Sequence, residues 1–535
     1  MIYFAEELEK QRRSGVLMIW IFISCREPMI KDTSIMEEEE SHGWYSQLYP
    51  EDWNPEYTDT QGLFLHDFSY AGYHNGEKEP PTVDDFSRYS VLNYGADPQG
   101  QNDSTAAFHS AIEAAIGGGI VWVPEGLYRI DGVLRIEHSN IVLAGEGSDK
   151  SRLRFTKDTS MTDQSSIIFS GTVIQGMEEM IVQDISSRSK EAYIENPEAL
   201  REGQDVALGW VITDDFVEEH GMSDYWSVFN GQWVPFFRRT IENVDEDNVS
   251  FDVPSRYRAM LRDLASIRIE EGYISECGIQ DLSVANAIEF LQALQFDRVH
   301  AIQFEGVKDC WMKNVHSFAP PEHTHHLQSG GVKILSSKRV TVADSRMEQA
   351  QHRGGGGNGY LFEVSQSSEI LIRDSIGIAG RHNFIQNWGF GTTGCVFLRT
   401  ESRDGTAYID ETGELSSVGY SEFHHSLAMA NLIDSSTADD GWKAVNRLFY
   451  SSGSGHSATE NVFWNIKGEG SLYSYQYGYG YVIGSTNIDV YTEVSNVYDS
   501  FGTAPEDFSE GIEEGSTLIP QSLYEDQLRR RLSRQ

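Results

Sequence analysis

Two pairs of histidine and arginine in the middle of the 535-residue chain carry side chains that can act on an anionic substrate. His352 and Arg353 precede four glycines, and Arg381 and His382 follow 29 residues later. Arginine can hold a carboxylate through two parallel hydrogen bonds, and histidine can move a proton near neutral pH. If consecutive turns of the chain stack, the two pairs line one groove suited to β-elimination from a uronate.

A second group of side chains is typical of glycoside hydrolysis. Asp439 and Asp440 offer paired carboxylates, of which one would protonate the leaving oxygen while the other activates water. His456 follows in the same region of the chain. An exposed loop that merely carries two acidic residues is the alternative interpretation of this pattern.

Several other residues have side chains suited to binding sugar or metal: His424, His425, Lys443, Trp388 and Tyr477. Tyr477 belongs to a strict alternation of five tyrosines between Tyr473 and Tyr481, which on a strand would share one face and stack on sugar or on each other. The adjacent histidines could bind metal, but they lack the helical spacing typical of zinc sites. Calcium held by acidic loops would help to bind an anionic polymer.

The charge of the chain is uneven. There are 41 Lys and Arg against 82 Asp and Glu, a formal net charge of −41, which excludes nucleic-acid binding for the bulk of the chain. Between residues 301 and 403, however, eleven basic residues face nine acidic ones, and nine of the 16 histidines lie between residues 316 and 456. An acidic glycan is therefore compatible with the middle of the chain.

The elements that must position these residues repeat with a fixed period. Asn314, Asp344 and Asp374 lie thirty residues apart, each at the end of an alternating apolar and polar segment. A period of this size indicates stacked coils of an all-β solenoid, with the Asn and Asp residues at the corners. One elongated repeat fold accounts for the chain length without several globular domains.

The most informative local segment spans residues 91–128. A Tyr-Gly-Ala-Asp strand end, a helix that begins near Asp103 or Ser104, a glycine run and Val-Pro-x-Gly-x-Tyr follow in order. This order resembles the N-terminal cap of the pectate-lyase-like superfamily, which includes rhamnogalacturonase-, polygalacturonase- and epimerase-like proteins. The resemblance implies a single-stranded right-handed parallel β-helix and a role in glycan processing, but no one reaction. Asp439, Asp440 and Gly455-His456 are also similar to elements of polygalacturonase-like hydrolases, with different spacing.

The N-terminus is typical of an exported chain. Basic residues precede a short apolar run and then Cys25, so residues 1–25 are predicted to be a bacterial lipoprotein signal that anchors the protein to lipid at the outer membrane. The alternatives are a misplaced start or a buried apolar segment. The other three cysteines, Cys277, Cys310 and Cys395, are predicted to be free and buried.

Six segments follow from these patterns. They are the signal at 1–25, an acidic tether and extended arm at 26–90, the N-terminal cap and first coils at 91–180, a β-rich insertion at 181–272, the main β-helix at 273–515 and a C-terminal capping helix at 516–535. The helix is expected because Ser522 and Glu525 form a capping box. The sequence leaves the oligomeric state open.

The sequence thus predicts an exported enzyme that cleaves an acidic extracellular polysaccharide, with no nucleic-acid partner. In the lyase mechanism Arg353 and Arg381 neutralise the carboxylate, and His382 or His352 is the base. An inverting hydrolase that uses Asp439 and Asp440 is the alternative. A non-catalytic glycan-binding or adhesive β-helix is a third possibility from a different class.

Overall fold

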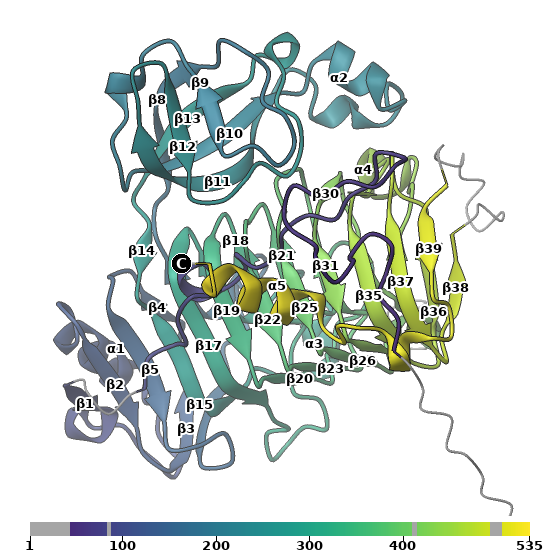
Figure 1. The fold of residues 1–535 in the computed structure, drawn as a ribbon. Coiled ribbons are helices and arrows are strands. Elements are labelled where there is room, and N and C mark those ends of the chain that lie inside the picture. Colours follow the sequence, from purple (N-terminus) through teal and green to yellow (C-terminus); the bar gives the residue numbers. More distant parts are fainter. Residues whose placement is uncertain (1–42, 83–86, 409–414, 493–505, 535) are drawn as a thin grey trace, which may run out of the picture. The chain divides into compact units, whose positions relative to one another are not determined.

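The computed structural model describes residues 43–82, 87–408, 415–492 and 506–534 (Figure 1). The chain divides into the units Met1–His42 and Gly43–Gln535, and all described residues belong to the second. Cys25 and the predicted signal lie outside the described residues. Within the described ranges, no helix is long and apolar enough to cross a membrane.

Two long sheets of parallel strands run the length of the second unit. The larger contains β1 (Arg88–Ser90), β2 (Gly119–Val123), β3 (Gly126–Ile130), β5 (Ile141–Gly145), β6 (Ser151–Phe155), β14 (Ile274–Ser275), β15 (Gly278–Ala285), β17 (Val307–Ser317), β19 (Lys338–Ala343), β20 (Arg346–Glu348), β22 (Leu371–Arg373), β23 (Ile376–Ile378), β25 (Val396–Leu398), β26 (Glu401–Arg403), β31 (Leu432–Asp434), β32 (Thr437–Ala438), β35 (Val462–Lys467), β37 (Tyr481–Thr486) and β39 (Phe508–Glu510). The smaller contains, in spatial order, β4 (Leu134–Ile136), β7 (Ser165–Ser170), β16 (His300–Glu305), β18 (Gly330–Leu335), β21 (Tyr360–Ser365), β24 (His382–Gln386), β29 (Ser421–Phe423), β33 (Trp442–Ala444), β36 (Ser471–Ser474) and β38 (Asp489–Tyr491). In the central coils each turn adds two strands to the larger sheet, such as β19 and β20 and then β22 and β23, and one strand to the smaller sheet, which confirms the predicted parallel β-helix.

The predicted thirty-residue period is confirmed in the central coils. Lys313 pairs with Ala343, and Ala343 with Arg373, in parallel register. The next residue of each strand, Asn314, Asp344 or Asp374, has a positive φ of 50–51°. Asn and Asp tolerate this left-handed conformation better than most residues, so they turn the chain at equivalent corners.

Apolar side chains from both sheets fill the interior of the coils. Phe362 stacks on Phe384 of the next coil, with ring centroids 4.9 Å apart. The three described cysteines, at positions 277, 310 and 395, are free and buried, as predicted. Because a solenoid interior is continuous, burial of such rows stabilises each coil through its neighbours.

The N-terminal cap also forms as predicted. Helix α1 (Thr105–Ala114) begins after Ser104 and buries Phe108, Ala111 and Ile112 against the first coils. Asp103 accepts a hydrogen bond from the backbone N–H of Thr105 at 2.9 Å. The cap therefore closes the apolar interior at the N-terminal end of the stack.

An antiparallel sheet of six strands interrupts the coils between residues 174 and 271, whereas the sequence predicted an insertion at 181–272. Its strands are β8 (Ile174–Met180), β9 (Glu191–Tyr193), β10 (Asp205–Val211), β11 (Trp233–Val244), β12 (Asn248–Phe251) and β13 (Ser266–Glu271), with α2 (Asp214–Glu219) beside them. Buried ion pairs attach it to the β-helix: Arg256 contacts Glu369 at 3.0 Å, and Asp205 contacts Lys338 at 2.8 Å. The insertion is thus fixed on the coils.

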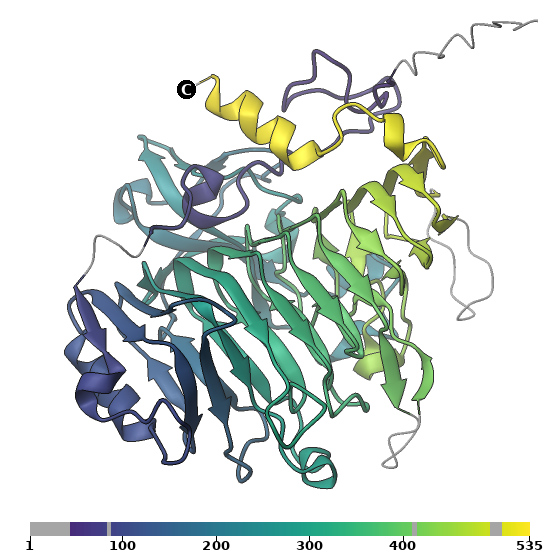
Figure 2. The same ribbon diagram turned by 90° about the horizontal axis from the view of Figure 1, so that it is seen from below.

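Residues 43–82 and the C-terminal helix lie together across the outer face of the larger sheet (Figures 1 and 2). Helix α5 (Leu523–Leu532) follows Ser522, whose side chain accepts the N–H of Glu525, so the Ser522 half of the predicted capping box is confirmed. The Glu525 carboxylate contacts Arg399. The helix covers the flank of the coils, against β31, instead of their open end. The remaining elements are α3 (Phe290–Ala293), α4 (Tyr450–Gly453) and the strand pairs β27 (Thr406–Tyr408) with β28 (Leu415–Val418) and β30 (Ala428–Met429) with β34 (Ala458–Thr459).

Candidate active site

A cleft of about 630 Å³ lies on the outer face of the smaller sheet, over β18, β21 and β24 and the loops that follow them. The cleft is lined by Asp163, Arg298, Lys333, Leu335, Gly356, Gly357, Tyr360, Glu363, Ser365, Gln366, Arg381, Asn387, Trp388, His424, His425, Ser451 and Ser452. Four of these, at 381, 388, 424 and 425, were candidates from the sequence. The size and the polar lining suit part of a sugar chain.

The strand register sets a row of charged side chains along this face. Lys333 pairs with Glu363, Glu363 with Ile385, Ile385 with Glu422, and Glu422 with Lys443. Since residues in register on parallel strands point the same way, these side chains all leave the sheet on its outer side. The row places acidic and basic groups within and beside the cleft.

A closed ring of hydrogen bonds fixes one histidine of the cleft. Arg447 donates to Glu422 Oε2 at 2.8 Å and to Ser451 Oγ at 3.3 Å. His424 Nδ1 contacts Glu422 Oε1, and its Nε2 lies 3.0 Å from Ser451 Oγ. Because Ser451 Oγ accepts from the arginine, its own proton is directed to His424 Nε2. The ring therefore assigns the proton of the imidazole to Nδ1 and leaves a lone pair on Nε2.

The ionisation of this group suits a base. Burial opposes the charge of Glu422, but Arg447 and the neighbouring histidines outweigh it and hold its pKa well below its usual range. Burial, and then the charge of Arg447, lowers the pKa of His424 below 6.5. His424 is therefore neutral at neutral pH beside an ionised carboxylate.

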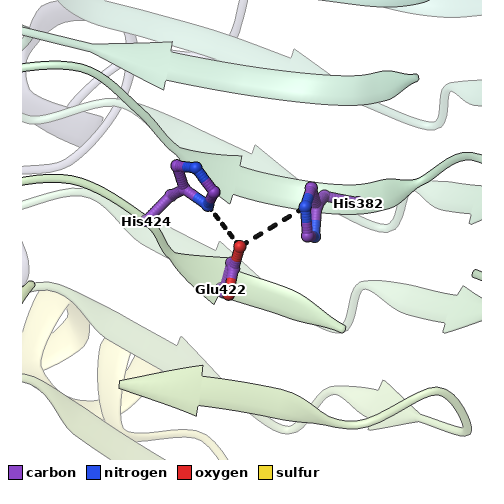
Figure 3. A group of neighbouring side chains, drawn as sticks. All are labelled: His382, Glu422 and His424. Atoms are coloured by element: carbon purple, nitrogen blue, oxygen red, sulfur yellow. Dashed lines mark hydrogen bonds and ion pairs between the residues drawn. The ribbon is translucent and has the colours of Figure 1, made fainter. Parts of the chain in front are cut away.

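His382 lies on the other side of the same carboxylate (Figure 3). Its Nε2 is 3.4 Å from Glu422 Oε1, and its Nδ1 lies 2.6 Å from the carbonyl oxygen of Tyr420. Burial lowers the pKa of His382 to about 3. The side chain is buried beneath the cleft, and its neutral ring donates to the Tyr420 carbonyl through Nδ1.

His382, Glu422 and His424 bring three ligand atoms within 4.8 Å of one another, which raises the question of a metal ion. Calcium takes six to eight oxygen ligands, whereas this group offers two imidazoles and one carboxylate. The second oxygen of Glu422 already binds Arg447, whose charge would oppose a cation at this point. The residues present therefore do not fit calcium.

Another carboxylate, that of Glu363, lines the cleft itself. Glu363 accepts from Asn387 Nδ2 at 2.9 Å and contacts His300 Nε2 at 3.0 Å. Burial would raise its pKa, but Lys333 and His300 outweigh that effect and lower it to about 2. Glu363 is thus ionised and well paired, which makes it a binding group and not a proton donor.

Strained loop residues and aromatic rings form the wall of the cleft. Trp388 has a φ of 41°, and Ser451 and Ser452 have φ values of 52° and 63°. Trp388 is 46% exposed, and its ring packs 4.4 Å from that of His425, which in turn packs against Phe229 of the insertion.

The two predicted Arg–His pairs do not stack on one another, because His382 pairs with Tyr360, 22 residues earlier. Arg381 lines the cleft and donates to the carbonyl oxygen of Gly354 at 2.8 Å. Arg353 lies outside the lining and donates to Ala350 O and Thr406 Oγ1. His352 is also outside it; Nδ1 accepts the N–H of Gly354, and Nε2 lies 3.2 Å from Asp297.

The residues predicted for hydrolysis are not gathered in the cleft. Asp439 is exposed, whereas Asp440 is buried and accepts bonds from Asn383 Nδ2 and the backbone of Gly405. Burial raises the pKa of Asp440 to about 7. His456 is buried beside the insertion, with its ring 5.3 Å from Tyr477. Paired carboxylates followed by a histidine suggested a site, but the fold separates these side chains.

The remaining two candidates have separate surroundings. Lys443 lies on β33 with its Nζ 3.6 Å from the ring centroid of Tyr420. The hydroxyl of Tyr477 donates to the carbonyl of Glu219 in the insertion at 3.0 Å. The predicted tyrosine strand is wrong, because β36 ends at Ser474 and β37 begins at Tyr481, so the chain turns between them.

Sequence reasoning missed several residues that line the cleft, Lys333, Tyr360, Glu363 and Ser451, and also Arg447, which holds Glu422 and Ser451. Lys333 and Glu363 are thirty residues apart, so the coil period could have paired them. Glu422 and His424 alternate on one strand and its end, which places them on one side of the sheet. No sequence signal connects Arg447 and Ser451 to this site, because they come from an irregular loop.

The fold and the cleft together define a parallel β-helix protein with a polar, histidine-containing cleft on one outer face. A family model described as rhamnogalacturonase A/epimerase, pectate lyase-like matches residues 89–195. This match confirms the predicted resemblance of the N-terminal cap to the pectate-lyase-like superfamily.

Mannuronan C5-epimerase AlgE5 from Azotobacter vinelandii is 39% identical over 75 residues, which cover 12% of this chain and 7% of that relative. Among solved structures, the Gp54 tailspike of Acinetobacter baumannii bacteriophage AP22 has a TM-score of 0.42 at 10% identity, covering 86% of this chain and 73% of the other. The A-module of mannuronan C5-epimerase AlgE4 from Azotobacter vinelandii has a TM-score of 0.33 at 12% identity, covering 79% and 94%.

Proposed function

We propose that the protein is a carbohydrate-active enzyme that removes the C5 proton from a uronate residue of an acidic polysaccharide and eliminates the substituent at C4. The observation that carries the proposal is His424, a neutral residue of the cleft whose Nδ1 is held by Glu422 and whose Nε2 accepts from the hydroxyl of Ser451, which also lines the cleft. An imidazole fixed in this way can take a proton. The family match and the epimerase relative support a uronate as substrate.

Cationic side chains in the cleft would hold the carboxylate of the sugar. Arg381 and Lys333 both line it, on neighbouring parts of the same face. A carboxylate that is neutralised in this way makes the adjacent C5 proton more acidic, because the charge that develops on the carboxylate oxygens is stabilised. These two residues take the role that the sequence gave to Arg353 and Arg381.

Tyr360 supplies the acid. Its phenol lines the cleft beside the histidines, and burial raises its pKa, so it stays protonated. In the proposed step the Ser451 hydroxyl turns away from His424 Nε2, which then takes the C5 proton. The C4–O4 bond breaks, and the phenol protonates the departing oxygen. The electron pair of the C5–H bond becomes the C4–C5 double bond, and the phenolate recovers a proton from the imidazolium or from water.

Hydrolysis is less well supported by this cleft. An inverting hydrolase needs one carboxylic acid that remains protonated. Asp163 and Glu363 both line the cleft, and nearby cations lower the pKa of each. Asp440, whose pKa is raised to about 7, is buried outside the cleft.

The test is incubation of the full chain with polygalacturonate and with alginate in D2O. Elimination predicts the ultraviolet absorbance of a 4,5-unsaturated uronate. Deuterium at C5 without that absorbance would instead assign C5 epimerisation, the activity named for the relative that matches 75 residues. Reducing ends without absorbance would assign hydrolysis, and no change in any substrate would favour a glycan-binding protein.

A pair of adjacent histidines provides a matched control. His424→Asn removes the proposed base, whereas His425→Asn alters a ring whose Nε2 already binds the carbonyl of Ser451. We expect the first change to slow C5 proton exchange by about 10³-fold and the second to retain most of it. Equal losses in both variants would contradict the assignment of His424.

A further inference from the structure

The polar row of the smaller sheet continues beyond the cleft toward the C-terminal coils. Lys443 is in register with Tyr473 of β36, and Tyr473 with Tyr491 of β38. The alternate residues of these strands point into the apolar interior, so Lys443, Tyr473 and Tyr491 all lie on the outer face. The charged row thus ends in an aromatic one.

The rings are arranged by direct contacts. Lys443 Nζ lies 3.6 Å from the ring centroid of Tyr420 and 5.5 Å from that of Tyr473. Tyr473 stacks on Tyr491 with centroids 4.9 Å apart and planes 10° from parallel. Tyr491 is 38% exposed, and the other two tyrosines are half-buried. The ammonium group is attracted to the faces of the rings and holds the first two in place.

The aromatic residues are connected to the candidate site. The carbonyl oxygen of Tyr420 accepts a hydrogen bond from His382 Nδ1 at 2.6 Å, and His382 contacts Glu422. From β24, which carries His382, to β36 there are three strand spacings, about 14 Å. A ligand that covers both the cleft and the aromatic residues must therefore be an oligomer and not a single sugar.

We propose that Tyr420, Tyr473 and Tyr491 form a tract of subsites for further sugar residues of the polysaccharide whose reacting residue lies in the cleft. This inference rests on the proposed function and adds the direction in which the polymer lies, along the stack of coils toward β38. The ring of Tyr491 stacks on Tyr473 through one face and can pack against the C–H face of a pyranose through the other, while the phenols of the tract can bond sugar hydroxyls. Lys443 adds positive charge beneath the tract, which suits a uronate chain.

The experiment measures binding separately from catalysis. In a His424→Ala background, the chain is run by affinity electrophoresis in gels that contain polygalacturonate, alginate or a neutral glucan, and octasaccharides and trisaccharides of the retained polymer are then titrated. Tyr473→Ala and Tyr491→Ala are each expected to weaken octasaccharide binding about five- to tenfold, with little change for trisaccharides. Tyr491→Phe keeps the ring and is expected to retain most of the affinity.

Tyr94→Ala is the matched control, because Tyr94 is also 38% exposed but lies near the N-terminal cap. Unchanged octasaccharide affinity in both tract variants would overturn the inference, as would equal losses for trisaccharides and octasaccharides. Failure of every acidic polymer to retain the protein would also overturn it. Retention that depends on Tyr473 and Tyr491, in a wild-type chain that shows no C5 exchange, would support the tract and contradict the proposed function.

Discussion

The two sheets of the β-helix have outer faces of opposite character, although both arise from the same coils. The larger sheet turns outward an apolar row that includes Leu371, Leu432 and Trp464, and residues 43–82 and α5 cover it. The smaller sheet turns outward Lys333, Glu363 and Glu422, and it carries the cleft. Inward residues maintain the stack on both sides, so the outer positions are free to specify either a covering segment or a site.

The largest expected effect is a fall in kcat when the proposed base on the face of the smaller sheet is removed. Replacement of His424 by Asn removes the proposed base and is expected to lower kcat by about 10³-fold, with unchanged circular dichroism, because general bases contribute about this much. Steady-state kinetics on the substrate identified by C5 exchange measures the effect. A variant that retains wild-type kcat would exclude the cleft as the catalytic site.

Replacement of Trp464 by Ala tests the covered face. The side chain is fully buried under α5 and the arm, and its Nε1 donates to the carbonyl of Pro520. The cavity is expected to lower the free energy of unfolding by about 3–5 kcal/mol. Urea unfolding measures this loss of stability. At low temperature, where the variant stays folded, kcat is expected to remain within about twofold of the wild-type value. A large fall in kcat of the folded variant would connect the two faces.

Asp440 tests the hydrolase alternative from inside the coils. The two carboxylate oxygens of Asp440 accept hydrogen bonds from Ser402 and Asn383. Asp440→Asn replaces one of these oxygens by an NH2 group that cannot accept, so one bond is lost and the free energy of unfolding is expected to fall by about 1–3 kcal/mol. We expect kcat to be unchanged. The raised pKa of Asp440 means that its contribution to stability is present at low pH and is lost as pH rises through about 7. A large fall in activity would restore Asp440 as a catalytic candidate.

The smallest expected effect is that of pH on the cleft. Since burial lowers the pKa of His424 below 6.5, the base is already neutral at pH 6.5, and kcat should change by less than about twofold between pH 6.5 and 8. Activity should fall only below the lowered pKa. A steep decline beginning near pH 7 would indicate another base. The free energy of unfolding should also fall with falling pH. Buried histidines such as His382 take up a proton more readily in the unfolded chain than in the folded one, so protonation below pH 6.5 favours unfolding.

Much of the fold could be predicted, and less of the site. The spacing of Asn314, Asp344 and Asp374 gave the coil period, and the capping box gave α5. The position of α5 could not be predicted, because its apolar side chains could pack against any exposed row of apolar residues on the coils. The predicted stacking of the pair at 352 and 353 on the pair at 381 and 382 is wrong. His382 pairs with Tyr360, 22 residues earlier, whereas paired residues in the central coils are thirty residues apart.

The sequence by itself determined the local rules of this protein: which residues point inward, where the coils turn and which end carries a cap. These depend on alternation, on left-handed corner residues and on helix caps, all of which act over a few residues. Only the tertiary structure decided that His424, Glu422 and Arg447 meet over Tyr360, because loops of unequal length shift the register between coils. The concentration of basic residues and histidines predicted that a site exists in the middle of the chain, and the stacking of strands selected its residues.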